Sequence, residues 1–134
     1  MATVSRDKLK ERGIKRFFKS FGYALDGLVY AFKYEQNMLV HILATIIVIV
    51  LGIVLNISSF EWLLCFLIIG LVIATELINT SIEAVVDLTC PETNPLAKVA
   101  KDTAAAAVMV FAIVAVLLGL CIFLPKIVAL ISTL

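Results

Sequence analysis

The stretch ATELINTSIEAVVDL, residues 74–88, places four polar side chains in a run that is otherwise apolar enough to enter a bilayer. These are Glu76, Asn79, Glu83 and Asp87, at spacings of 3, 4 and 4 residues. On a helix this spacing keeps all four within a sector of about 80°, which predicts one polar stripe on one face. An ionisable group at membrane depth costs roughly 2.5–3.5 kcal/mol, so such groups usually face a partner, a cavity or a substrate. The stripe could form a functional site, or it could only join helices through hydrogen bonds.

The composition of the whole chain indicates an all-α integral membrane protein. The 134 residues are 63% apolar and only 16% charged, and the mean hydropathy is +1.13. This is too short for two domains and too apolar for a soluble one, so we expect a single membrane domain over residues 1–134. Three cysteines without a paired motif and a single histidine do not suggest a zinc site.

The segment before the stripe changes character twice. Residues 1–13 form a basic head, and from residue 14 apolar positions recur every 3.5 residues among basic and aromatic side chains. This pattern predicts an amphipathic helix over 14–36 that lies on the membrane surface. A first span follows over 39–57. His41, near its start, is interpreted as a hydrogen-bonded interfacial residue, with a functional role as the less favoured alternative. Glu35 is interpreted as a carboxylate at headgroup depth or a solvated helix end.

Two more spans complete the pattern. The second begins at Trp62, an interfacial anchor, and covers 62–88, including the stripe. After the break CPETN, Asn94 as a cap and Pro95 at the first helical position predict a helix start. The third span covers 95–124 and ends before a proline.

The distribution of positive charge predicts the orientation. Eight of the 11 Lys and Arg residues precede residue 34, and only Lys126 follows the third span. Lys98 and Lys101, at the start of the third span, lie on the same side as those eight, so ten of the 11 fall on one side. This places the N-terminus in the cytoplasm and the C-terminus outside. A basic segment beside apolar spans is explained by orientation and anionic headgroups, so no nucleic-acid partner is expected.

Under this topology the polar groups collect near the cytoplasmic surface. Mg²⁺ typically uses one or two carboxylates plus phosphate oxygens, and lysines would neutralise phosphates. Glu76 lies deepest and is the candidate general base toward an alcohol. A phosphate-binding loop of the Walker type is absent, because Leu28 stands where its lysine belongs. The collected residues are Glu35, Glu76, Asn79, Glu83, Asp87, Lys98, Lys101 and Asp102.

At these residues the chain resembles the small bacterial membrane kinases that comprise diacylglycerol kinase and undecaprenol kinase. The resemblance covers about residues 16–126. The segments that carry it are RFFKSFGYALDGL (16–28), Glu35-x-Asn37 followed by His41, ELINTSIEAVVDL (76–88) and PLAKVAKDTAAAAV (95–108).

The resemblance implies roles for individual residues. Glu76 would be the catalytic base, Glu35 and Glu83 would bind the Mg²⁺ of Mg·ATP, and Asn79 would support the site. Asp87 is a further candidate support residue because it continues the stripe, and Lys98 is a candidate on the lipid side. The candidate nucleotide-binding residues are Arg16, Lys19, Tyr23, Glu35, Glu83, Lys101 and Asp102.

The resemblance also implies an assembly and a substrate class. The family fold is a domain-swapped homotrimer with a surface helix and three spans per chain, and its active sites lie between subunits. Diacylglycerol-specific members tend to have Gly-Ser shortly after the Lys-Asp pair, whereas Lys101 and Asp102 here continue into TAAAAV. We therefore favour undecaprenol over diacylglycerol. A transport subunit and a non-catalytic trimer are the other classes, and the first is disfavoured because no polar route crosses the spans.

Overall fold

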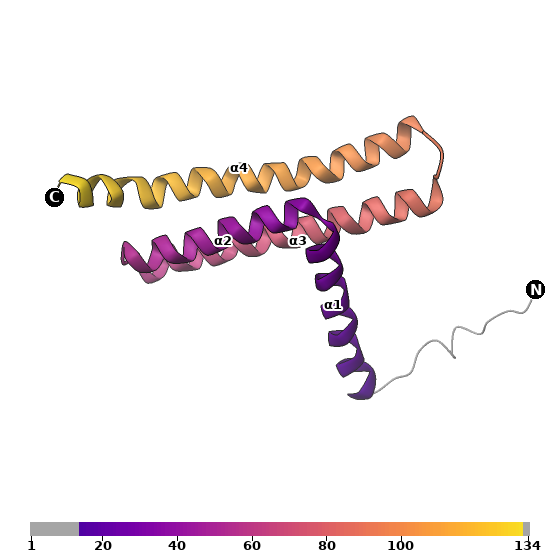
Figure 1. The fold of residues 1–134 in the computed structure, drawn as a ribbon, viewed down its shortest axis with the longest axis horizontal. Helices are drawn as coiled ribbons and strands as arrows, with labels where there is room; N and C mark the ends of the chain where they lie inside the picture. The colour runs from indigo at the N-terminus through magenta and orange to yellow at the C-terminus, as the bar shows by residue number, and fades with distance from the viewer. Residues whose placement is uncertain (1–13, 133–134) are drawn as a thin grey trace, which may run out of the picture.

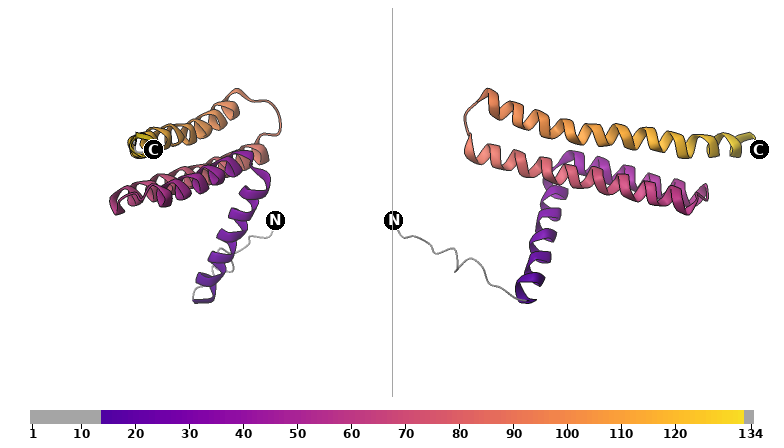
Figure 2. Two further views of the ribbon diagram at one scale, coloured as in Figure 1. Left: turned by 60° about the vertical axis from the view of Figure 1, so that its left-hand side comes forward. Right: turned by 180° about the vertical axis from the view of Figure 1, so that it is seen from behind.

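The computed structural model describes residues 14–132, which form four helices. The expected basic head, residues 1–13, lies outside the described residues. Three helices run alongside one another, and the first projects sideways from them (Figure 1; Figure 2). The helices are α1 (Ile14–Tyr34), α2 (Gln36–Val54), α3 (Ser59–Thr89) and α4 (Pro95–Ser132).

Three of these helices are long and apolar enough to cross a membrane: α2, α3 and α4. The prediction of an all-helical membrane protein with three spans is therefore confirmed at this level. Within the described chain α3 packs mainly against α4 and next against α2. The outward faces of all three carry large exposed apolar side chains, such as Leu43, Leu67 and Leu117.

A single extended residue separates α1 from α2. Glu35 has φ −99° and ψ 116°, and its N–H donates to the carbonyl of Ala31 at 2.9 Å. The sequence places the end of the first helix at residue 36 and the first span from residue 39, whereas the helix break falls at Glu35. This break lets α1 leave the direction of α2.

The turn between α2 and α3 is fixed by backbone conformation and a capping box. Asn56 has φ 50°, a left-handed conformation that asparagine tolerates better than most residues. The Ile57 N–H then donates to the Gly52 carbonyl at 3.1 Å, so α2 ends before residue 57. Ser58 Oγ accepts from the Glu61 N–H at 3.3 Å, while the Glu61 carboxylate accepts from the Ser58 N–H at 2.6 Å. These reciprocal bonds start α3 one turn before Trp62.

Close packing at one glycine sets how α2 and α3 meet. A Cβ on Gly52 would lie 2.6 Å from Cη2 of Trp62, so only glycine admits the indole ring here. The ring also stacks on Phe66, with the ring centroids 5.3 Å apart. Trp62 borders a small core formed by Ile57, Cys65, Ile122 and Phe123.

Helix α4 begins where the sequence indicates and extends further than the expected span. Asn94 Oδ1 accepts from the Leu96 N–H at 2.8 Å, and Pro95 is the first helical residue. The helix continues through Pro125 to Ser132, although a proline inside a helix removes one backbone donor and crowds the preceding turn. Beyond Pro125, Lys126 Nζ lies 3.2 Å from the Glu61 carboxylate of α3.

Candidate active site

The polar stripe on α3 (Glu76, Asn79, Glu83 and Asp87) is graded in exposure. Glu76 is 0% exposed and Asn79 4%, whereas Glu83 is half-buried and Asp87 is exposed. The predicted polar face is therefore present, and it runs from a buried end to an open end. Burying a carboxylate at the closed end costs free energy unless the group is hydrogen-bonded or paired with an opposite charge.

The buried end of the stripe faces a histidine of α2. Glu76 Oε2 lies 3.9 Å from His41 Nε2, which is beyond hydrogen-bond distance. Neither carboxylate oxygen of Glu76 makes a well-formed hydrogen bond among the described residues, although the Asn37 side chain lies close to the carboxylate, and His41 Nε2 has no partner there either. Both side chains line a cavity of about 190 Å³ between α2, α3 and α4, called the inner cavity below. Asn37 and Asn79 also line it.

One turn beyond Glu76, the stripe forms an internal hydrogen bond. Asn79 Nδ2 donates to Glu83 Oε1 at 3.1 Å. Asn79 Oδ1 is buried and has no partner among the described residues. Asn79 thus holds Glu83 through its donor, and the residue also lines the inner cavity.

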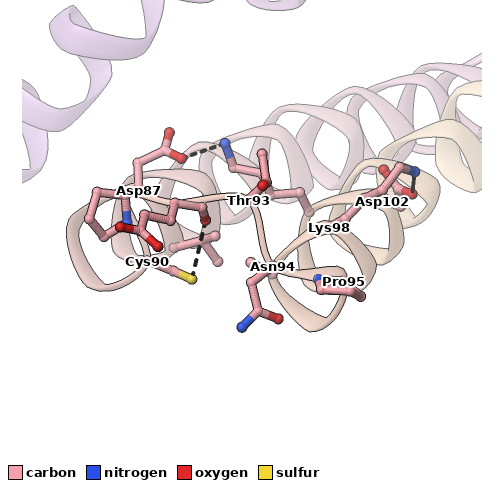
Figure 3. A pocket seen from close by; sticks show the side chains of 12 residues that line it. Asp87, Cys90, Thr93, Asn94, Pro95, Lys98 and Asp102 are labelled. Atoms are coloured by element: carbon pink, nitrogen blue, oxygen red, sulfur yellow. Dashed lines mark hydrogen bonds and ion pairs between the residues drawn. The ribbon is translucent and has the colours of Figure 1, made fainter.

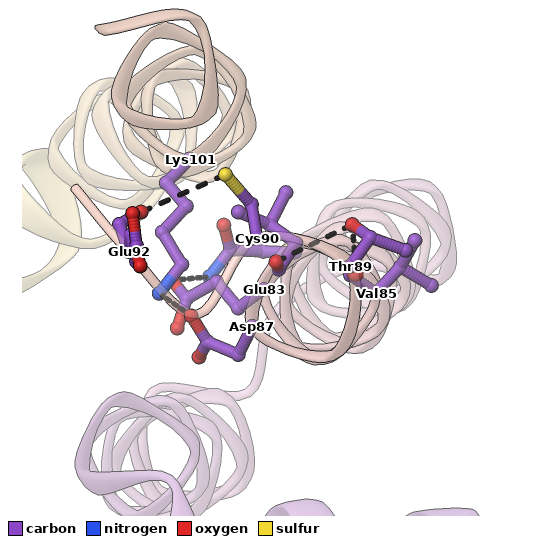
Figure 4. Close-up of polar contacts among 9 residues, drawn as sticks. Glu83, Val85, Asp87, Thr89, Cys90, Glu92 and Lys101 are labelled. Atoms are coloured by element: carbon purple, nitrogen blue, oxygen red, sulfur yellow. Dashed lines mark hydrogen bonds and ion pairs between the residues drawn. The ribbon is translucent and has the colours of Figure 1, made fainter. Parts of the chain in front are cut away.

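The open end of the stripe is joined to α4 by an ion pair. Lys101 Nζ lies 2.6 Å from Asp87 Oδ1. Figure 4 shows Lys101 reaching from α4 toward Asp87 and Glu83 of α3. Asp102, although next in sequence, pairs with Lys98 on its own helix. Lys98 and Asp102 thus share a face, whereas Lys101 points across to α3.

A wide pocket opens at the turn between α3 and α4. Its volume is about 660 Å³, and its wall carries the ionisable residues of both helix ends. Figure 3 shows Asp87 on one side of this loop pocket, with Lys98 and Asp102 on the other. Two lysines and open access suit a phosphate-bearing ligand. The ionisable residues of the wall are Asp87, Glu92, Lys98, Lys101 and Asp102.

The candidate residues of α1 lie apart from this cluster within one chain. The first turns of α1, which carry Arg16, Lys19 and Tyr23, are the part of that helix farthest from α2–α4 (Figure 1; Figure 2). Tyr23 is 71% exposed. Glu35 is closer to the bundle and half-buried at the start of α2. A single chain therefore unites the stripe, His41 and the α4 lysines, but not the start of α1.

Sequence reasoning missed two of these relationships. The sequence indicates an interfacial His41, whereas the structure places its Nε2 3.9 Å from Glu76 Oε2. The ion pair between Asp87 and Lys101 was also not anticipated. The single histidine of an apolar span is the indication that the sequence offers for the first, and the second depends on the path of the loop.

The fold and site define a multi-pass membrane protein whose buried acidic stripe leads to a lysine-lined pocket, a combination suited to phosphoryl transfer onto a lipid. The sequence profile described as "Prokaryotic diacylglycerol kinase" matches residues 22–123. The chain belongs to this family, and it is a lipid kinase.

Individual relatives extend the match over most of the chain. Undecaprenol kinase of Bacillus subtilis (strain 168) is 44% identical over 122 residues, covering 91% of this chain and 98% of that protein. Diacylglycerol kinase of Helicobacter pylori (strain ATCC 700392 / 26695) is 42% identical over 101 residues, covering 75% of this chain and 79% of that protein. Diacylglycerol kinase of Escherichia coli (strain K12) is 34% identical over 105 residues, covering 78% and 86% respectively.

Proposed function

We propose that this lipid kinase transfers the γ-phosphoryl group of Mg·ATP to the hydroxyl of undecaprenol at the cytoplasmic face of the bacterial cell membrane. The alcohol oxygen forms a bond to the γ-phosphorus as the bond to the leaving ADP breaks. The hydroxyl proton passes to a carboxylate. The products are the lipid monophosphate and ADP.

The observation that carries this proposal is the burial of the Glu76 carboxylate without a hydrogen-bond partner. Its two carboxylate oxygens are buried and unpaired among the described residues, at the edge of the inner cavity. A general base must lie within hydrogen-bond reach of the proton it accepts. An alcohol entering the inner cavity would meet this carboxylate, so Glu76 is the catalytic base in the proposal.

Mg·ATP is assigned to the open end of the stripe. Among residues 14–132, no three His, Cys, Asp or Glu side chains lie close enough to form a dedicated metal site. Mg²⁺ in kinases needs only one or two carboxylates because phosphate oxygens and water complete its shell. Half-buried Glu83, held by Asn79, fits this requirement, with Glu35 as the second carboxylate. Mg²⁺ would supply charge neutralisation at the phosphates.

Two lysines and the start of α1 complete the nucleotide site in this proposal. Lys101 would bind phosphate oxygens beside Asp102, while Asp87 orients Lys101 and Lys98 faces the lipid headgroup. Arg16, Lys19 and Tyr23 would come from another subunit, because the start of α1 projects away from its own bundle. This supports sites shared between subunits, and the resemblance to the family makes a homotrimer the proposed assembly. The large exposed apolar residues on α2–α4 would contact lipid or neighbouring subunits.

The proposed placement in the membrane follows from α1 and the charge distribution. Exposed aromatic residues such as Phe17, Phe21 and Phe32 suit a helix that lies in the headgroup plane. The N-terminus would be cytoplasmic and the C-terminus extracytoplasmic, since most Lys and Arg residues precede the first span. The loop pocket then opens toward cellular ATP.

The choice of lipid rests on similarity between whole chains. Identity to an undecaprenol kinase is 44% with nearly complete coverage of that protein, against 42% and 34% over shorter segments of two diacylglycerol kinases. Diacylglycerol is the second candidate, because those relatives share the family and most of its length. The family membership disfavours a transport or non-catalytic subunit.

The test is transfer of labelled phosphate from ATP to undecaprenol and to diacylglycerol, measured side by side in mixed micelles. We expect kcat/KM to be higher for undecaprenol. Preference for diacylglycerol would replace the substrate assignment, and the absence of transfer to both lipids would refute the proposed function. Glu76→Gln is the matched inactive control.

A further inference from the structure

His41 and Glu76 form a gap of defined size at the buried end of the stripe. The 3.9 Å between His41 Nε2 and Glu76 Oε2 exceeds a hydrogen bond, yet an oxygen atom about 2.8 Å from both would close it. Buried polar atoms nearly always have partners, and here the ring nitrogen and both carboxylate oxygens have none among residues 14–132. The geometry calls for a group that donates to one side and accepts from the other.

His41 also lies where polar and apolar spaces meet. It lines the inner cavity with Glu76, and it lines an apolar groove of about 250 Å³ that runs along α2, α3 and α4 toward Phe123. Val40 and Ala112 line both spaces as well. An amphipathic ligand whose chain lies in the groove would therefore present its polar end at His41. A lipid alcohol has that shape.

We propose that His41 binds the oxygen of the acceptor alcohol, its Nε2–H donating to that oxygen while the hydroxyl proton points at Glu76. This inference rests on the proposed kinase function and assigns its acceptor site. The proton belongs on Nε2 because a lone pair there would face the carboxylate oxygens. During transfer the O–H bond breaks toward Glu76 and the O–P bond forms, whereas His41 keeps its proton.

A purely structural role for His41 does not explain why its imidazole Nε2 is buried without a hydrogen-bond partner among the described residues. The backbone carbonyl of His41 accepts a hydrogen bond from Thr45 Oγ1 at 2.8 Å, and this bond does not involve the imidazole ring. The ring Nε2 has no hydrogen-bond partner in the part of the chain that the structure describes. Thr45 lines the apolar groove but not the inner cavity, so it offers a matched control on the same helix.

The test uses two inhibitors that cannot be phosphorylated: the O-methyl ether of the lipid alcohol, and the corresponding hydrocarbon without oxygen. The ether keeps the acceptor oxygen and has no proton for Glu76, so its binding reports on His41 without catalysis. A neutral hydrogen bond contributes about 0.5–1.5 kcal/mol, which predicts that the ether inhibits the unmodified kinase about two- to twelvefold more strongly at equal mole fraction. His41→Leu removes this preference, and Thr45→Val retains it.

A second pair of variants, His41→Gln and His41→Asn, tests the inference if His41→Leu does not fold. The amide nitrogen of glutamine reaches the position of Nε2, whereas that of asparagine reaches only the position of Nδ1. The ether preference therefore persists in His41→Gln and disappears in His41→Asn. An identical preference in these two variants, or a preference retained in His41→Leu, overturns the inference. An unmodified enzyme that phosphorylates no lipid alcohol refutes the proposed function instead, and the phosphate-transfer assay shows this separately.

Discussion

Lys101 of α4 pairs with Asp87 of α3 at 2.6 Å, while its sequence neighbour Asp102 pairs with Lys98 one turn away on the same helix. The two adjacent residues thus point to different partners. Lys101 is held at the rim of the loop pocket with Glu83 nearby (Figure 4). The ion pair thus ties the Lys101 ammonium to the end of α3.

Substitutions of Lys101 and of its partner Asp87 test whether the lysine charge itself binds Mg·ATP. We expect Lys101→Met to raise the KM for Mg·ATP by about tenfold or more, because it removes a charge-assisted bond to phosphate. Asp87→Asn keeps the Lys101 charge and an oxygen that can accept from it, so this exposed substitution should change the KM by less than about threefold. Lys126→Met, at the opposite end of α4, is the control and should leave it unchanged. Equal effects of Lys101→Met and Lys126→Met would exclude a nucleotide role for Lys101.

The two proposed metal ligands should respond to Mg²⁺ concentration. Glu83→Gln and Glu35→Gln each remove one carboxylate without adding a buried charge, so both proteins should fold and insert. We expect both to lose turnover at limiting Mg²⁺ and to recover part of it at high Mg²⁺. Steady-state kinetics across a Mg²⁺ titration measure this. Unchanged activity of both variants at limiting Mg²⁺ would show that the metal lies elsewhere.

The orientation can be measured with an impermeant thiol reagent on intact cells. The native cysteines Cys65, Cys90 and Cys121 are first replaced by alanine. Ser59→Cys, which spares the capping serine, should then react from outside, and Glu92→Cys in the loop pocket should react only after the cells are opened. The positive-charge distribution determines this expectation. The reverse labelling pattern would place the site away from cellular ATP and refute the kinase proposal.

The stripe itself could be predicted from sequence, because spacing alone places Glu76, Asn79, Glu83 and Asp87 on one helix face. Burial of a charge in a span is also costly enough to identify the group as functional or paired. The graded exposure from Glu76 to Asp87 is the expected consequence of a stripe that leaves the bundle. The position of the stripe and the cost of burying it follow without tertiary information, whereas the exposure of each residue comes from the structure.

The partners of the stripe could not be predicted, because they depend on how helices are registered. His41 meets Glu76 only because the turn at Asn56 and the fit of Trp62 over Gly52 set α2 against α3. Lys101 meets Asp87 because the Cys90 to Asn94 break returns α4 along the same face of α3. Spacing within one helix contains no information about either relationship.

The packing of Trp62 over Gly52 can be tested by a pair of matched substitutions. Gly52→Ala places a Cβ 2.6 Å from the indole ring, so we expect a loss of about 1–3 kcal/mol, the usual cost of overpacking. Gly70→Ala, in α3 with nothing within 4 Å of the new Cβ among residues 14–132, should be neutral or slightly stabilising. Thermal unfolding in detergent measures both. Equal Tm values for the two variants would contradict the close contact.

The final prediction is that Glu76→Gln abolishes phosphate transfer and leaves the affinity for Mg·ATP nearly intact. Glu76 lies seven residues before Glu83, about 10 Å deeper along α3, and it faces the inner cavity instead of the loop pocket. A neutral amide cannot accept the alcohol proton, and general-base catalysis is typically worth about 10²- to 10⁴-fold. The amide also has a lower burial cost than a carboxylate, so the variant should be at least as stable as the parent.

Single-turnover transfer and nucleotide binding, measured on the same preparation of Glu76→Gln, decide between the two possible roles of this carboxylate. Glu83→Gln is the comparison, because it should weaken Mg·ATP binding as well as transfer. If Glu76→Gln weakens nucleotide binding as strongly as Glu83→Gln, then Glu76 belongs to the metal shell. If it retains turnover within about tenfold of the parent, the alcohol proton leaves by another route, since a lost general base costs more than this.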